Sequence, residues 1–308
     1  MNIMNIKYRI IVPSLAIALV SIVAGKAAAA VAEKVGAAAC AACHSDQVDG
    51  FKKNSHAKNL PALKKISFEE SCETCHGPGS LHVGAGGDKS NPDFATIKNP
   101  KKLNAQAAAE TCLQCHADQK RMFWKGSAHE SRSVSCLQCH SMHHSKNEKL
   151  LAGKDELDTC FKCHQLRKAQ NMRSSHMPLS EGKMVCSSCH NPHGTAGPKL
   201  LAQNSINENC YSCHAEKRGP FLWEHPPVRE NCLTCHEAHG SQHDKLLKVK
   251  RPRLCQQCHI ESQHPTTSGA IAENIDAGIR NIGGSRACVQ CHSTFHGSNH
   301  PAGPRFTR

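Results

Sequence analysis

The chain is poor in the side chains that normally fill a protein core. Of its 308 residues, 4% are Phe, Trp or Tyr and 39% are hydrophobic. Rossmann, barrel and sandwich domains bury layers of such side chains between their elements. We therefore expect none of these folds, and we expect a group other than side chains to occupy much of the interior.

Long apolar runs are also missing, except near the N-terminus. Lys7 and Arg9 precede a mostly apolar stretch over residues 10–25, and small residues follow at 27–30. This pattern predicts a secretory signal peptide, residues 1–30, cleaved after Ala30. A retained membrane anchor is the alternative, although the run is slightly short for a span. No later segment approaches the roughly 18 apolar residues that a spanning helix needs.

Cysteine and histidine, by contrast, are abundant. The chain has 20 Cys and 23 His, and every Cys belongs to one of ten C-x-x-C-H motifs. The motif cysteines are Cys40, Cys43, Cys72, Cys75, Cys112, Cys115, Cys136, Cys139, Cys160, Cys163, Cys186, Cys189, Cys210, Cys213, Cys232, Cys235, Cys255, Cys258, Cys288 and Cys291. The motif histidines are His44, His76, His116, His140, His164, His190, His214, His236, His259 and His292.

This spacing is the attachment signal of c-type haem, in which two thiols bind the haem edge and the adjacent imidazole binds the iron. Disulfides or zinc ribbons would also use many cysteines, but neither requires a His after every second Cys. We therefore predict ten covalently bound haem c groups, numbered here one to ten by motif.

The net charge of +13 fits this prediction. Losing the signal peptide removes Lys7, Arg9 and Lys26 and leaves about +10. Haem propionates are anions that Lys and Arg can pair with. The basic balance therefore needs no nucleic-acid partner, and we predict none.

A unit of two motifs repeats through the middle of the chain. Each unit has an upstream His, a C-x-x-C-H-x-x-H segment, Lys-Leu-Leu and a second C-x-x-C-H. Three clear copies begin at His129, His176 and His225, and a looser copy begins at His56 with an insert around residues 77–100. Motif one resembles the second half of a unit, and motif ten resembles the first half of another.

Thirteen histidines lie outside the motifs, and the repeat assigns ten of them as second axial ligands. Five lie upstream of a motif and five follow one; they are His56, His129, His176, His225, His264, His82, His143, His193, His239 and His296. His144, His243 and His300 are left without a role. A His three residues after a motif His is expected to serve a neighbouring haem, because its own haem has its distal face on the other side. The sequence does not indicate which His pairs with which iron.

We predict a multihaem cytochrome c of short α-helices and loops, with little or no sheet, since sustained alternation of apolar and polar residues is missing. The repeat favours stacking along one direction, and hence an elongated haem chain. Two imidazoles on each iron leave no open position and favour low potentials, so we predict an electron conductor and no enzyme. A multihaem reductase would need an open iron, and a soluble periplasmic electron shuttle or charge store that donates to a reductase is the main alternative.

Several segments are similar to the DmsE/MtrA-type periplasmic decahaem cytochromes. They are Cys186-Ser-Ser-Cys-His-Asn-Pro-His-Gly, Leu254-Cys-Gln-Gln-Cys-His, and Cys288–His292 followed by Phe295-His-Gly-Ser-Asn-His-Pro. The resemblance covers nearly the whole mature chain. It departs at His143-His144, where His-Gly would be typical, so the ligand there stays open.

The resemblance implies a wire that passes electrons across the outer membrane inside a β-barrel porin partner, with the protein in the periplasm and associated with the outer membrane. It implies an inner-membrane quinol-oxidising or periplasmic cytochrome donor. The acceptor would be a surface multihaem cytochrome that reduces metals, or an extracellular dimethyl-sulfoxide reductase. It also implies two pentahaem halves, residues 31–170 and 171–308, a division that cuts across the two-motif unit.

Overall fold

The computed structural model describes residues 31–145, 147–259, 288–301 and 303–306. The predicted signal peptide and His264 lie outside the described residues. The division into halves at residue 170 is not tested by any boundary in the structure and stays a prediction.

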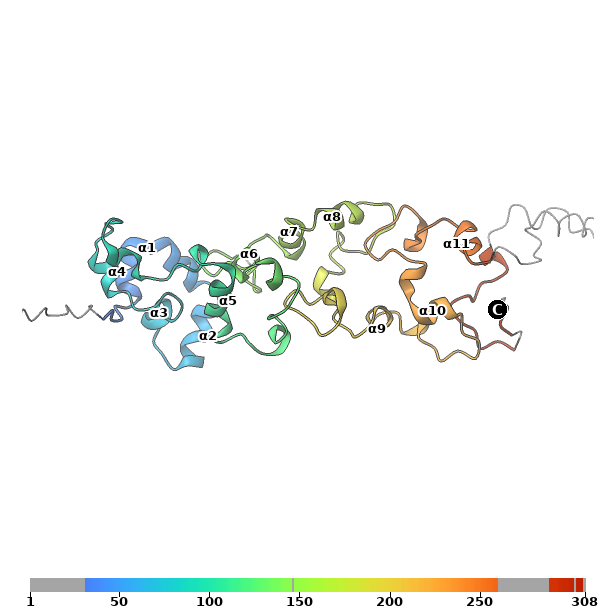
Figure 1. Cartoon of the computed structure of the whole chain (residues 1–308), viewed down its shortest axis with the longest axis horizontal. Coiled ribbons are helices and arrows are strands. Elements are labelled where there is room, and N and C mark those ends of the chain that lie inside the picture. The colour runs from blue at the N-terminus through green and yellow to red at the C-terminus, as the bar shows by residue number, and fades with distance from the viewer. Residues whose placement is uncertain (1–30, 146, 260–287, 302, 307–308) are drawn as a thin grey trace, which may run out of the picture.

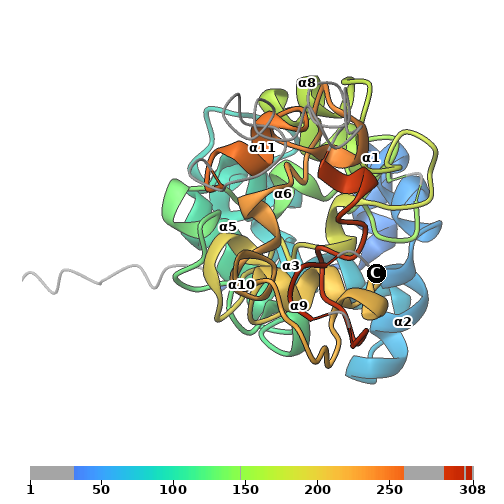
Figure 2. The same cartoon turned by 90° about the vertical axis from the view of Figure 1, so that its right-hand side faces the viewer.

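The molecule is elongated, and its α-helices from α5 to α11 follow the long axis in sequence order (Figure 1). Helices α1 to α4 lie at one end, and α11 lies near the other. Viewed along the long axis, helices from both ends lie around a common centre (Figure 2). The α-helices are α1 (Ala37–Lys52), α2 (Ser55–Lys64), α3 (Ser71–His76), α4 (Ser80–Gly84), α5 (Ala105–Leu113), α6 (Cys136–Cys139), α7 (Glu156–Phe161), α8 (Gln165–Asn171), α9 (Ile206–Tyr211), α10 (Pro226–Glu230) and α11 (Arg253–Gln256).

Short 3₁₀ turns complete the secondary structure: η1 (Phe68–Glu70), η2 (Pro92–Thr96), η3 (Pro100–Lys102), η4 (Gln119–Arg121), η5 (Glu130–Arg132), η6 (Cys186–Ser188), η7 (Pro198–Leu200), η8 (Ala215–Lys217), η9 (Cys232–Thr234), η10 (Asp244–Leu246) and η12 (Cys288–Gln290). Over the described ranges there are isolated β-bridges but no strand. The predicted class of short helices and loops is confirmed. Within the same ranges, no helix has the length and apolar character to span a bilayer.

Each C-x-x-C-H motif folds as a single helical turn. In motifs three to ten the His backbone N–H donates to the carbonyl of the first Cys, over 2.8–3.1 Å. Residues three and four positions apart lie on the same side of a helical turn. Both thiols and the imidazole therefore leave the turn together, which is what attachment to one flat group requires.

In two of the three central units, a helix cap sets the turn of the second motif. Asp155 accepts a hydrogen bond from Asp158 N–H at the start of α7, and Ser205 accepts from Glu208 N–H at the start of α9. Side chains of this type satisfy the free N–H groups of a first turn. Because each cap lies five residues before the first Cys, it fixes where the motif falls on the helix.

The Lys-Leu-Leu segment folds back on the first motif of its unit. Its second Leu forms a β-bridge with the motif His in all three copies, His140–Leu151, His190–Leu201 and His236–Leu247. The first Leu adopts a positive φ of 54–57° in each copy. This conformation is uncommon for a branched side chain, so the contacts of the repeat must maintain it.

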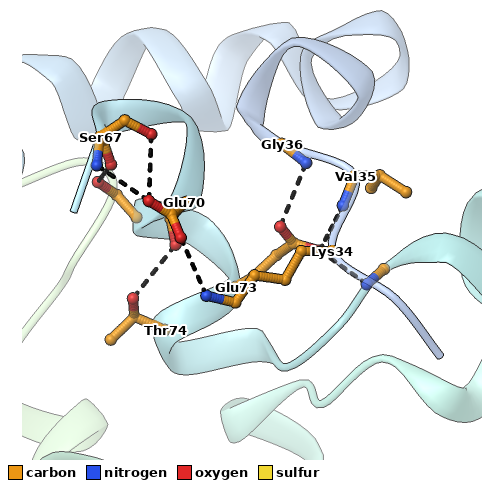
Figure 3. Close-up of polar contacts among 9 residues, drawn as sticks. Lys34, Val35, Gly36, Ser67, Glu70, Glu73 and Thr74 are labelled. Carbon is orange, nitrogen blue, oxygen red and sulfur yellow. Dashed lines mark hydrogen bonds and ion pairs between the residues drawn. The ribbon is translucent and has the colours of Figure 1, made fainter. Parts of the chain in front are cut away.

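Buried apolar side chains are few in the described part of the chain, and most are small: Ala37, Val48, Ala85, Ala108, Ala109, Trp124, Leu150 and Leu247. Polar contacts take over part of the packing at the N-terminal end (Figure 3). The buried carboxylate of Glu73 in α3 accepts hydrogen bonds from the backbone N–H groups of Val35, Gly36 and Gly79, at 3.0, 3.2 and 2.9 Å. Glu73 therefore holds the segment before α1 against motif two.

Candidate haem sites

A continuous cavity of about 3300 Å³ runs through much of the molecule, lined by residues from Ala39 to Lys248. At least one Cys of each of the first seven motifs lines it, together with many of the predicted axial histidines. This volume lies where a core would otherwise be, as the shortage of aromatic side chains led us to expect.

The thiols of successive motifs lie next to one another along the whole row. The first cysteines approach closely enough to shift the pKa of one partner in the pairs Cys40–Cys72, Cys112–Cys136, Cys160–Cys186, Cys210–Cys232 and Cys255–Cys288. The second cysteines approach closely enough to raise the pKa of one partner in the pairs Cys75–Cys115, Cys139–Cys163, Cys189–Cys213 and Cys235–Cys258.

These nine contacts join motif one to motif two, two to three, and so on to ten, and they alternate between first and second cysteines. The attachment points therefore form one unbranched row in sequence order. Haem edges attached there would lie near the edges of their neighbours on both sides.

Eight motif histidines face a histidine that lies outside the motifs. The pairs, with the distance between ring centres, are His44–His82 (6.4 Å), His76–His143 (6.0 Å), His116–His56 (5.8 Å), His140–His193 (6.1 Å), His164–His129 (6.1 Å), His190–His239 (6.1 Å), His236–His296 (6.2 Å) and His259–His225 (6.2 Å).

This spacing fits an iron held between two imidazoles. An imidazole nitrogen lies about 2 Å from a bound metal ion, and the ring centre lies about 1 Å behind the nitrogen. Two such ligands on opposite sides of one ion place their ring centres about 6 Å apart. The pairs therefore have the separation that bis-histidine ligation requires.

The pairing follows a rule that links the units. The upstream His of a unit faces the second motif of the same unit, as His129 faces His164. The His after the first motif faces the first motif of the preceding unit, as His193 faces His140. The expected neighbouring haem is thus two motifs back in the sequence, not one. At the N-terminal end the rule changes, and His82 faces His44 of motif one.

Burial keeps most of the distal imidazoles neutral. Loss of solvent, together with nearby positively charged groups, lowers the pKa of His193 and of His296 to about 4. Burial is also the main cause of the lowered pKa of His143 and His239. The neutral ring is the form that binds a metal ion, so these sites suit the predicted role.

Many of the paired rings are oriented by a hydrogen bond from Nδ1. Motif histidines of the even-numbered motifs bond a backbone carbonyl of a basic residue: His76 to Lys98, His140 to Lys149, His190 to Lys199, His236 to Lys245 and His292 to Arg305. Two distal rings do the same, His82 to Phe94 and His129 to Pro192. A bond at Nδ1 leaves Nε2 with its lone pair directed away, toward the predicted iron.

One predicted ligand, His176, lies against no motif His in the described residues. The pairing rule above would place it against His214, but the two rings make no contact. His176 bonds Arg173 O through Nδ1 at 2.8 Å and Glu181 through Nε2 at 3.0 Å, and the Glu181 bond raises its pKa. His264, the other predicted ligand without a placed partner, lies outside the described residues. Both assignments stay predictions.

The three histidines without a role include His144, whose ring centre lies 6.2 Å from that of its neighbour His143. His143, not His144, faces His76, while His144 lies 3.9 Å from Asp46. His296, not His300, faces His236. The geometry thus favours the ligand choices at both positions. The backbone acceptors at Nδ1 could not be found from the sequence, because a carbonyl group carries no residue signature.

Comparison with known proteins agrees with this arrangement. A family described as doubled CXXCH motif matches residues 129–169, 176–219 and 225–264, which begin at the upstream His of three predicted units. A family described as cytochrome c554 and c-prime matches residues 39–71. The multiheme cytochrome MtrA of Shewanella baltica (strain OS185) is 44% identical over 277 residues, which cover 89% of this chain and 81% of that protein.

The chain belongs to the MtrA-type multihaem c-type cytochromes. It carries covalently bound haem c, and it is an electron-transfer protein, not an enzyme. The two-motif repeat and the family resemblance are both confirmed.

Proposed function

We propose that the chain binds ten haem c groups, one at each motif, and that every iron has two histidine ligands. The eight imidazole pairs and the unbroken row of thiol contacts support this. When bound, haem supplies one-electron redox chemistry.

In this proposal the protein's own residues do three things. The motif turns hold the haems in sequence order, and the paired imidazoles keep each iron closed to other ligands. The carbonyls that bond Nδ1 fix the ring orientation in both oxidation states. Little has to move when charge passes along the row, which keeps the reorganisation at each step small.

We further propose that the row serves as a conduit from the periplasm through the outer membrane, inside a β-barrel partner. The chain would receive electrons from an inner-membrane quinol-oxidising or periplasmic cytochrome and deliver them to a surface cytochrome or extracellular reductase. The elongated shape, with the motifs in order along it, supports this function best (Figure 1). A conduit needs its two ends far apart, whereas a shuttle needs only one exposed haem.

Vesicles that contain a reduced viologen dye can test the conduit. They would carry the co-expressed barrel alone or the barrel with this chain, and a soluble ferric chelate would be added outside. We expect rapid dye oxidation only with the complete complex.

The control is the same chain added to barrel-free vesicles, which should leave the dye reduced. If dye oxidation requires the chain but not the barrel, or if the chain never co-purifies with the barrel, the shuttle is favoured and the conduit is wrong.

A further inference from the structure

We propose that His56 and His116 give the third haem a higher reduction potential than the six haems that have one axial histidine anchored by a backbone carbonyl. The inference rests on the proposed bis-histidine ligation. It concerns how the chain differentiates otherwise equivalent sites along the row.

Six of the eight described imidazole pairs share one feature. In each, one ring donates its Nδ1 hydrogen to a backbone carbonyl over 2.7–3.0 Å. These anchored rings are His82, His76, His140, His129, His190 and His236, which belong to haems one, two, four, five, six and eight.

The pair at haem three, His56 and His116, has no such anchor. His56 Nδ1 is buried and has no hydrogen-bond partner. In the described part of the chain, no hydrogen bond affects His116 either; burial and nearby charges are the causes of its lowered pKa. Because His56 Nδ1 has almost no exposed surface, solvent cannot replace the missing acceptor.

The pair at haem nine, His225 and His259, is not equivalent to the pair at haem three. His225 Nδ1 is also buried without a close acceptor, but the backbone of Phe295 still interacts with that ring. The comparison is therefore made with the six anchored pairs.

An acceptor at Nδ1 makes the imidazole a stronger donor to its metal. Stronger donation stabilises ferric iron more than ferrous iron, because the ferric ion carries the additional positive charge. An anchored ligand therefore lowers the reduction potential, and a site with two unanchored ligands keeps a higher one.

The pair at haem five, His129 and His164, provides an internal control. His129 occupies the same place in its unit as His56 does, and both face the second motif of the unit. The two ring planes cross at 79° in the pair at haem three and at 66° in the pair at haem five. In the six other pairs the angle between the ring planes is only 13–23°. The two sites thus share ring geometry and differ in the Pro192 carbonyl that anchors His129.

Electron paramagnetic resonance can follow these two sites in the intact holoprotein. Crossed imidazole planes give ferric low-spin haem a signal at unusually large g, separate from the signals of near-parallel ligands. During stepwise reduction, we expect this signal to disappear in two steps. The variant His56→Ala should remove the component that reduces at the higher potential.

A matched pair of substitutions tests the cause. Nδ1-methylhistidine keeps Nε2 for the iron but has no Nδ1 hydrogen. At position 129 it should raise the potential of the lower reduction step toward that of the upper one. At position 56 it should leave the potentials of both steps unchanged. Mass spectrometry and a low-spin optical spectrum confirm that each variant is fully loaded.

A single step in the wild-type protein, or removal of the lower step by His56→Ala, would overturn the inference. So would an equal shift from methylation at both positions. If either methylated variant is incompletely loaded, the wild-type steps and His56→Ala still decide. The conduit proposal is judged separately, because vesicle transport can fail while these potentials stay as expected, and the reverse also holds.

Discussion

The central units and the N-terminal region build the same kind of site in different ways. In the three central copies, the acceptor for the motif His lies nine residues further on, in Lys-Leu-Leu. At motif two, His76 bonds Lys98, 22 residues further on and across the insert. Both regions keep the hydrogen bond to the ring, while the length of chain between the ring and its acceptor varies.

The two regions also differ in how the row ends. In the centre, each unit supplies a ligand to the unit before it, so the units interlock. At the N-terminal end the preceding motif is motif one, which resembles the second half of a unit, and His82 faces its His44. Glu73 adds polar contacts there that the central units do not have.

Deleting a central unit should have the largest effect on the number of haems but should leave the order of the remaining units intact. Removing residues 176–224 joins Ser175 to His225, which keeps the repeat in register because Ser175 normally precedes His176. His239 would then face His140 in place of His193. We expect a protein with two fewer haems and a low-spin spectrum, by mass spectrometry and optical absorption.

The matched deletion of residues 77–100 at the N-terminal end should behave differently. It removes His82 and the Lys98 carbonyl, although every Cys remains. We expect high-spin ferric haem or poor accumulation. A low-spin, fully loaded product would show that the insert does not supply a ligand.

Single ligand substitutions should have an intermediate effect in both regions. His193→Ala in the centre and His82→Ala at the end should each open one iron to solvent, because each removes one ring of a pair. We expect binding of one carbon monoxide per reduced protein in either variant. His144→Ala is the control and should bind none; binding by the control would reverse the choice between His143 and His144.

The smallest expected effect concerns Glu73, which only the N-terminal region has. Glu73→Ala leaves the N–H groups of Val35, Gly36 and Gly79 without their acceptor. An unsatisfied buried donor costs about 1–3 kcal/mol, less where water can reach it. We expect a lower thermal unfolding midpoint and faster proteolysis near residues 33–36, with the haem content unchanged.

Lys34→Ala is the comparison for Glu73→Ala, since it removes only the exposed ion pair with Glu70 (3.2 Å). Exposed pairs of this kind contribute about 0–1 kcal/mol. Equal destabilisation by the two variants would mean that Glu73 has no special part in holding this segment.

Much of the site could be predicted because its signals are local. The two thiols and the imidazole of a motif lie within one helical turn, so their spacing in sequence is their spacing in space. The repeat likewise indicated which further histidines to consider, and the structure places eight of those ten against a motif His. His176 shows the limit of this signal, since its place in the repeat predicts an axial ligand while its ring bonds Glu181.

The amino-acid sequence alone determined the kind of cofactor, the motifs that attach it and the repeating unit, because each depends on residues a few positions apart. Only the tertiary structure decided which histidine faces which motif and which carbonyls orient the rings. His143 and His76 are far apart in the chain, and many histidines compete for each partner. The choice is made by the packing of one unit against the next, which no local spacing encodes.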